Sequence, residues 1–289
     1  MGTAALQWKQ FLNRLWARLN EHEIFDRAAQ LSYYFLLALF PLLLFMMTLL
    51  GYFAGESAEV RDKLLSYLAR VMPPSAIDLV HTTLNEITQT RSGSKLSLGL
   101  LAALWAASNG MGAISDTLNG AYGVEETRPW WKVRLTAVVL TVALSILIIT
   151  ALGIVLYGGG IGERLAAYLG LGAAFTIVWK ILQWPIALFF LLLTFTMIYH
   201  FGPNVRPKKC KWWSWGTLVA IILWLLFSFA FRLYLHYFNS YGVTYGSLGA
   251  LIILMLWFYF TGVSILIGGE INSMFEKRAG AQGEAYDWK

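Results

Sequence analysis

YGSLGALIILMLWFYFTGVSILIGGEI, the stretch from Tyr245 to Ile271, decides the class of fold to which this chain belongs. It runs for 27 residues and contains a single charged side chain, Glu270, close to its end. About 20 apolar residues in a helix suffice to cross the ~30 Å hydrocarbon core of a bilayer. The stretch is therefore long enough to span a membrane. Glu270 is costly there unless its carboxylate is paired, protonated or close to water.

Composition extends this conclusion to the whole chain. Hydrophobic residues make up 58% of the 289 residues and charged residues 13%, whereas soluble proteins have about 45–50% and about 25%. A water-soluble core cannot bury that much apolar surface, so we predict an integral membrane protein. The single cysteine excludes an intramolecular disulfide.

Hydropathy predicts six transmembrane helices, approximately at residues 31–54, 96–118, 135–157, 173–200, 213–237 and 247–272. Outside them, residues 6–19 have the spacing of an amphipathic helix at the membrane surface, and the first loop that of an outer-face helical hairpin. The predicted fold is all-α. It divides into a cytoplasmic amphipathic arm (1–30), a six-span membrane domain (31–272, with the hairpin at 55–95) and a cytoplasmic tail (273–289).

The distribution of positive charge predicts the orientation. Of the 22 Lys and Arg residues, fourteen fall before the first span, in the second and fourth loops, and in the tail. Cytoplasmic loops carry such an excess, so both termini are expected in the cytoplasm. Because these residues form short clusters beside spans, we expect a lipid bilayer as partner, and no nucleic acid. The oligomeric state stays open.

Enzyme chemistry is not expected from this sequence. Hydrolysis assisted by a metal needs histidines and carboxylates that converge on one site, but the predicted topology separates the four histidines, His22, His81, His200 and His236. The sequence has no phosphate-binding glycine loop and no nucleophile elbow. We therefore expect no catalytic residue, no metal and no cofactor.

Polar residues within the predicted spans are the candidates for a substrate site. Asn109 and Asp116 are two helical turns apart and share one face of the second span. That face is either the wall of a polar cavity or a place where helices hydrogen-bond to one another, with Asp116 as an interfacial cap. Lys180 and Gln183 precede Pro185 in the fourth span and are candidates for lining irregular structure.

Four charged residues near the predicted membrane surfaces complete the set. Arg232 either reaches the outer interface or binds an anionic headgroup. Glu126 and Arg128 in the second loop are candidates for an ion pair. Glu270 lies about 35 Å along the last span at 1.5 Å per residue, and therefore at the cytoplasmic boundary. We interpret it, together with Asp116, as part of an inner gate or as a partner of cations in the second or fourth loop.

Four segments resemble one known family in their order and spacing. They are LSYYFLLALFPLLL (31–44), NGMGAISDTLNGAYGVEETRPWWKVR (109–134), FGPNVRPKKCKWWSWG (201–216) and NSYGVTYGSLGALIILMLWFYFTGVSILIGGEIN (239–272). They resemble the YihY/BrkB family of bacterial inner-membrane proteins over roughly residues 25–275. The resemblance implies a six-span protein of the inner membrane. Family members have been linked to virulence and some to export of envelope lipids, and an older ribonuclease label is regarded as a misassignment.

These observations favour transport as the function. The expected cargo is an amphiphile or a lipid-linked envelope component, such as an anionic lipid, bound by Lys180, Gln183, Arg232 and Asn109. A membrane scaffold without catalytic activity, which organises an envelope complex through the outer hairpin, is the alternative. A channel for ions or small solutes is a third, disfavoured because no aligned rings of charge are visible.

Overall fold

The computed structural model describes residues 2–54, 93–169, 173–205, 214–237 and 241–281, and every regular element in these ranges is an α-helix. The helices are α1 (Gly2–Glu21), α2 (Ile24–Ala54), α5 (Gly93–Tyr122), α6 (Trp130–Leu169), α7 (Ala173–Phe201), α8 (Trp215–Tyr237) and α9 (Tyr241–Ala281). The predicted all-α class is confirmed. The predicted outer hairpin (55–95) falls almost wholly outside the described residues.

Four helices of the described chain are long and apolar enough to cross a membrane. The qualifying segments are Trp130–Val155, Ile177–Phe201, Trp215–Tyr234 and Leu251–Glu276. They coincide with the third to sixth predicted spans. The first two predicted spans fall within α2 and α5, which are also continuous helices, and the count of six spans stays a prediction.

Several helices run past their predicted ends. Helix α6 has 40 residues and continues to Leu169, although hydropathy placed a loop after Tyr157. Hydropathy marks the apolar part of a helix and not its end. The residues ERLAAYL (163–169) are mostly good helix formers and continue the helix beyond the apolar part. Helix α9 similarly reaches Ala281, within the predicted tail.

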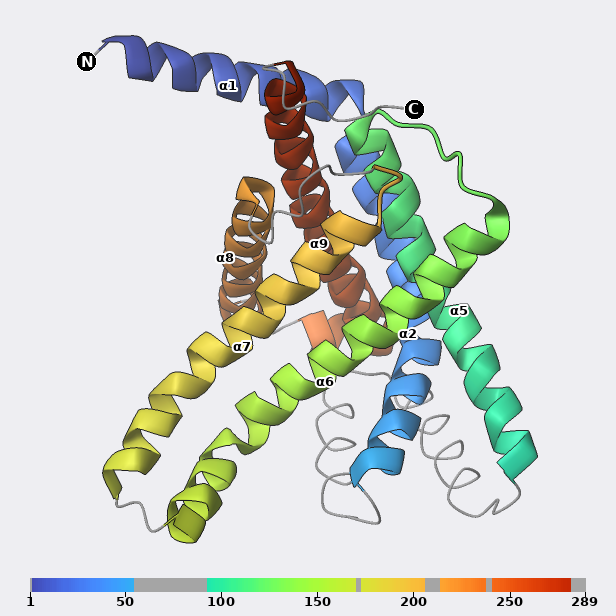
Figure 1. Ribbon diagram of the computed structural model, residues 1–289, viewed down its shortest axis with the longest axis vertical. Helices are drawn as coiled ribbons and strands as arrows, with labels where there is room; N and C mark the ends of the chain where they lie inside the picture. The colour runs from blue at the N-terminus through green and yellow to red at the C-terminus, as the bar shows by residue number, and fades with distance from the viewer. Residues whose placement is uncertain (1, 55–92, 170–172, 206–213, 238–240, 282–289) are drawn as a thin grey trace.

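The chain alternates in direction through the bundle. Helix α1 lies across one end of the molecule, which we call the α1 end (Figure 1). Asn119, near the end of α5, accepts a hydrogen bond from the backbone of Asn204, just after α7. The backbone N–H of Gly216 at the start of α8 donates to Asn272 near the end of α9. Helices α5, α7 and α9 therefore finish at the end where α8 begins.

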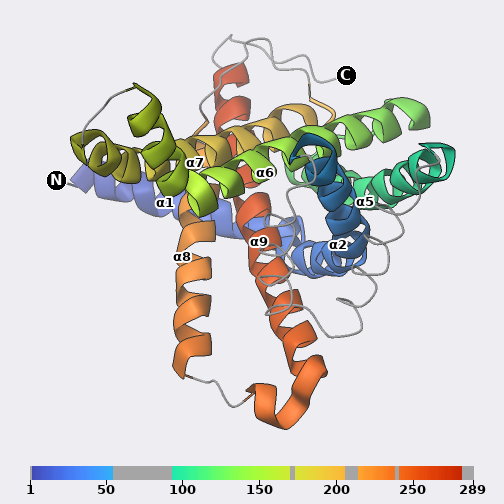
Figure 2. The ribbon, with the colours of Figure 1, turned by 90° about the horizontal axis from the view of Figure 1, so that it is seen from below.

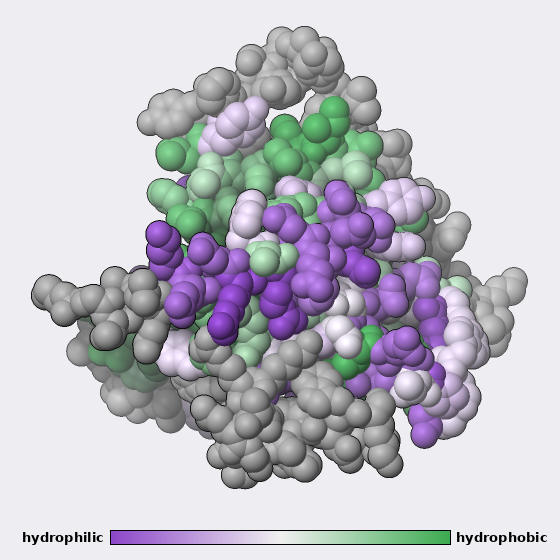
Figure 3. All heavy atoms as spheres, turned by 90° about the horizontal axis from the view of Figure 1, so that it is seen from above, coloured by the Kyte–Doolittle hydropathy of each residue, from purple (hydrophilic) through white to green (hydrophobic). Residues whose placement is uncertain are grey.

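Packing brings distant parts of the chain together. Helix α2 packs against α5 and α9, α6 against α7, and α8 against α9, and Figure 2 shows α8 beside α9 from the opposite end. The fully buried apolar side chains come mainly from these central helices: Ile24, Ala28, Leu31, Leu118, Ala121, Ala220 and Leu266. Hydrophilic side chains gather on the face at the α1 end (Figure 3). The bundle thus has an apolar body and a polar cap.

Candidate functional site

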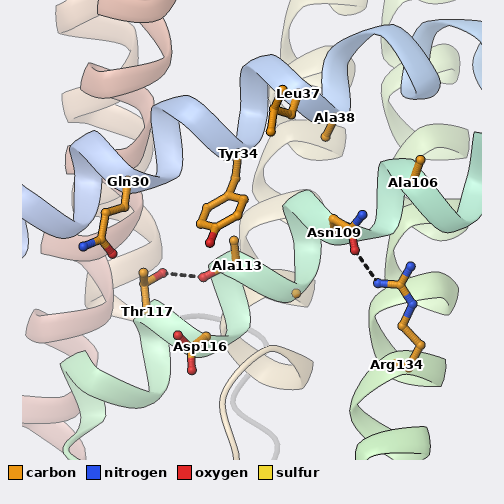
Figure 4. Close-up of a pocket in the computed structure, with 11 residues that line it drawn as sticks. Gln30, Tyr34, Leu37, Ala38, Ala106, Asn109, Ala113, Asp116, Thr117 and Arg134 are labelled. Atoms are coloured by element: carbon orange, nitrogen blue, oxygen red, sulfur yellow. Dashed lines mark hydrogen bonds between the residues drawn. The ribbon is translucent and has the colours of Figure 1, made fainter.

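A pocket of about 470 Å³ with both polar and apolar lining residues opens between α2, α5 and the start of α6 (Figure 4). Helix α2 contributes Gln30 and Tyr34, α5 contributes Asn109 and Asp116, and α6 contributes Arg134. In Figure 4, Arg134 and Asn109 lie toward one side of the pocket and Asp116 toward the other, with Tyr34 between them. The pocket therefore presents a positive and a negative group at separate places.

Arg134 is held in place by α5. Its Nη1 donates to Asn109 Oδ1 at 2.7 Å, and its Nη2 donates to the backbone carbonyl of Trp105. The guanidinium carbon lies 3.7 Å from the centre of the Trp105 ring, a cation–π contact. A guanidinium has five N–H donors, and only two have acceptors among the described residues. The buried Nε is one of the donors without an acceptor.

Neither charge in the pocket is neutralised. No carboxylate among the described residues pairs with Arg134, and Asp116 is exposed with no described cation beside it. An unpaired charge is costly in an apolar environment, so the buried cations of folded proteins are usually paired with an acid. The exposed Asp116 carries no such cost, but a concave site with a few convergent polar groups, here Asn109, Asp116 and Arg134, is the usual form of a ligand-binding pocket.

The surface beside the pocket is apolar and aromatic. Trp130 and Trp131 are 72% and 57% exposed, and Trp105 is 49% exposed. The rings of Trp105 and Trp130 lie 6.2 Å apart. Tryptophan concentrates at the level of the lipid headgroups. Exposed tryptophans thus lie beside the positive part of the pocket, and the exposed Leu135 and Val139 follow it on α6.

A second polar site joins α1 to α9. The Glu270 side chain is fully buried, and its Oε2 accepts a hydrogen bond from Arg18 Nε at 2.8 Å. His22 Nδ1 contacts the other carboxylate oxygen. Arg18 also donates to Ser273 Oγ at 3.0 Å and to the carbonyl of Ala121 at 3.2 Å. One ion-paired cluster therefore fixes α1 to the ends of α5 and α9.

A third network ties the turn between α5 and α6 to the end of α7. Glu126 accepts hydrogen bonds from Arg128 Nη2 at 2.7 Å and from Asn119 Nδ2 at 2.9 Å. Arg128 Nη2 also donates to the carbonyl of Gly202. Asn204 donates through its side chain to Thr127 at 2.8 Å. These bonds fix the conformation of the turn between α5 and α6.

Acid is expected to weaken this turn. Partial burial raises the pKa of Glu126, but hydrogen bonds from Arg128 and Asn119 outweigh burial and bring the pKa below its ordinary value of 4.5. The carboxylate therefore stabilises the fold above pH 4.5, and this stability is lost as the pH falls through the lower, folded-state pKa. Between about pH 5 and 3, the melting temperature of the Glu126→Gln variant should fall less than that of the wild type. Equal slopes in thermal unfolding in detergent would contradict this role of Glu126.

The structure separates the residues predicted to bind a substrate. Asn109 lines the pocket. Lys180 and Gln183 lie on α7 and Arg232 on α8, and none of the three belongs to its lining. Lys180 and Arg232 are exposed, whereas the Gln183 Oε1 atom is buried without a hydrogen-bond donor among the described residues. No single site collects all four residues.

The candidates for an inner gate or ion pair also have defined places. Glu126 and Arg128 pair with each other, and Asp116 lines the pocket. The described partners of Glu270 are Arg18 and His22 of the amino-terminal segment, and the cations of the fourth loop lie outside the described residues.

Sequence reasoning missed Arg134, the cation of the pocket. It was counted with the charges of the second loop, although α6 already begins at Trp130. Its signal was present in the sequence. Arg134 follows a Trp-Trp pair and directly precedes a long apolar run, the arrangement of an interfacial residue at a helix start.

The long apolar helices and the polar cap define a multi-pass helical membrane protein. Within the described part of the chain, no group of three His, Cys, Asp or Glu residues is placed to hold a metal ion. The sequence model of the family described as Virulence factor BrkB matches residues 15–289. The chain belongs to this family.

Named relatives agree with this membership. The Bacillus subtilis protein named "Putative ribonuclease-like protein YfkH" is 39% identical over 268 residues, which cover 93% of this chain and 96% of YfkH. A UPF0761 membrane protein of Aggregatibacter aphrophilus is 27% identical and covers 93% of each chain. A UPF0761 membrane protein of Xanthomonas campestris is 26% identical over 92% of this chain and 63% of its own length. No solved structure matches the chain.

Proposed function

We propose that this protein is a flippase-like transporter that moves an amphiphile across the bacterial inner membrane. The observation that carries the proposal is the pocket between α2, α5 and α6, which places Arg134 and Asp116, both unpaired, beside an apolar outer surface. Moving a charged headgroup through hydrocarbon is costly, and polar groups inside a bundle lower that cost. The pocket would receive the head of the amphiphile while its tails stay in the lipid.

The exposed surface around the pocket supports this arrangement. Leu37 lines it and is 55% exposed, and Leu101 and Leu135 on α5 and α6 are 60% and 56% exposed. Apolar side chains at such positions are suited to contact with lipid acyl chains. A headgroup in the pocket could thus keep its tails on a lipid-facing surface without leaving the membrane.

The proposed orientation places the pocket toward the cytoplasmic leaflet. The excess of Lys and Arg before the first span and in the second and fourth loops assigns the α1 end to the cytoplasm, with six spans and both termini inside. Arg134 lies near the start of α6 and therefore near this end. The pocket would then take an amphiphile from the inner leaflet for export.

Movement of lipid in reconstituted vesicles tests the proposal. The purified full-length chain is placed in liposomes with phospholipids labelled on one short acyl chain, and a membrane-impermeant quencher reports the labels that reach the outer leaflet. We expect loss of fluorescence well beyond the half that empty liposomes lose. Folded protein that moves no more label than empty vesicles would contradict transport and leave the scaffold as the better account.

A further inference from the structure

We infer that the pocket recognises the headgroup of a zwitterionic phospholipid, with the phosphate at Arg134 and a primary amine at Asp116. The inference rests on the proposed function and makes it more specific, because it names the lipid headgroup and the two residues that bind it. It follows from the donors that Arg134 leaves unused, from the separation of Asn109 and Asp116 along α5, and from the exposed tryptophans beside Arg134.

Arg134 has the geometry of a phosphate site. A planar guanidinium binds phosphate oxygens through parallel N–H donors, and such charge-assisted bonds are stronger than neutral ones. The contacts with Asn109 and with the ring of Trp105 hold the group in one orientation, so little conformational freedom is lost on binding. Three of its five N–H groups have no acceptor among the described residues. The one on Nε is buried, so the second N–H groups of Nη1 and Nη2 are those left for a phosphate, and no described carboxylate pairs with them.

Asp116 supplies the complementary charge for an amine. It lies seven residues after Asn109 on the same face of α5, and this spacing corresponds to about 10 Å along the helix. In an ethanolamine phosphate headgroup the phosphate is negative and the amine is positive. When the headgroup lies along α5, its phosphate can face Arg134 while its amine faces Asp116. The exposed Gln30 on α2 adds further hydrogen-bonding capacity in the lining. A purely anionic headgroup would satisfy Arg134 and leave Asp116 without a cation.

The surroundings favour a lipid over a free phosphate ion. Trp105 and Trp130 are exposed beside the positive part of the pocket, with their rings 6.2 Å apart. Tryptophan side chains prefer the headgroup level of a bilayer. A ligand anchored there keeps its phosphate at the interface and its acyl chains beside the apolar residues of α5 and α6.

Binding of short-chain lipids to the purified full-length protein in detergent tests the inference. The quenching of tryptophan fluorescence is followed with dihexanoyl phosphatidylethanolamine, dihexanoyl phosphatidylglycerol, dihexanoylglycerol and inorganic phosphate as separate probes. We expect phosphatidylethanolamine to bind most tightly, phosphatidylglycerol more weakly and inorganic phosphate at least about ten-fold more weakly. Dihexanoylglycerol, which lacks the phosphate, should bind least.

Two variants separate the contributions of Arg134 and Asp116 to binding, and a third variant serves as the control. The Arg134→Gln variant should bind both phospholipids about 10- to 100-fold more weakly, because bonds to charged groups contribute that much. The Asp116→Asn variant should lose the preference for the amine and bind phosphatidylglycerol like the wild type. Lys132→Gln removes a neighbouring cation on α6 outside the lining and should leave every affinity within about three-fold.

Several results would overturn the inference. They are wild-type affinity in Arg134→Gln, equal binding of dihexanoylglycerol, and inorganic phosphate binding as tightly as the lipid. If Arg134→Gln does not fold, two other variants test the site. Arg134→Lys keeps the charge and loses the planar fork, and Asp116→Asn reports the lipid preference. Binding without movement in vesicles would contradict transport and leave this site intact. Movement that Arg134→Gln does not slow would contradict this site and leave transport intact.

Discussion

Replacement of Glu270 by Leu should lower the free energy of unfolding by about 3–5 kcal/mol, because it leaves the partly buried guanidinium of Arg18 without its acid. Glu270 is fully buried and accepts from Arg18 Nε at 2.8 Å, with His22 against its second oxygen. Without the carboxylate, Arg18 keeps only its bonds to Ser273 and the Ala121 carbonyl. Equilibrium unfolding in mixed micelles measures the loss.

A double variant separates a lost ion pair from lost packing. Replacing a whole buried pair by apolar residues is often neutral or stabilising, so Arg18→Met combined with Glu270→Leu should recover most of the stability. Glu125→Gln removes an exposed acid from the turn after α5 and serves as the control, with an expected change within about 0.5 kcal/mol. A single Glu270→Leu variant as stable as the control would contradict the role given to this cluster.

The Gly268→Ala variant should lose about 3 kcal/mol of stability through the close contact of α8 and α9. A Cβ at position 268 would overlap the Tyr199 hydroxyl and lie 2.7 Å from the carbonyl oxygen of Gly216. The backbone of Gly216 has little room to move, since its N–H donates to Asn272. Displacing Tyr199 would also break its 2.7 Å hydrogen bond to the carbonyl of Ile265. Overpacking and a lost buried hydrogen bond together give this magnitude.

Gly153→Ala is the matched control for that substitution. Gly153 also lies within a membrane helix, α6, but a Cβ there meets nothing within 4 Å. Alanine has the higher helix propensity, so this variant should be neutral or slightly more stable, by up to about 1 kcal/mol. If both variants unfold alike in mixed micelles, the close packing at Gly268 is not a source of stability.

Much of the fold could be predicted because the bilayer imposes a simple rule on sequence. Apolar runs of sufficient length predicted the helices that the structure has at Trp130–Val155 and Leu251–Glu276. Helix ends were less predictable, since α6 continues into polar sequence as far as Leu169. Hydropathy predicts the minimum length of a membrane-spanning helix, but it does not predict the residue at which the helix ends.

The sites were harder to predict because their members come from distant parts of the chain. Glu270 was expected near one membrane surface, and the structure places it at the α1 end, but its partner Arg18 is 252 residues away. Only the packing of α1 against α9 brings the two together. Arg134 and Asn109 are 25 residues apart. Their contact required knowing which faces of α5 and α6 meet, which hydrophobic pattern alone does not determine.

The most direct test of the central claim is to fill the pocket and measure lipid movement in vesicles. Gly112 lines the pocket, and a Cβ added there meets nothing within 4 Å, so a side chain can begin at this position and Gly112→Phe should occupy the cavity. Gly153→Phe places the same side chain on α6, outside the lining, as the control. We predict that Gly112→Phe reduces movement of labelled lipid at least about ten-fold while Gly153→Phe matches the wild type. Undiminished movement in folded Gly112→Phe would contradict transport through this pocket.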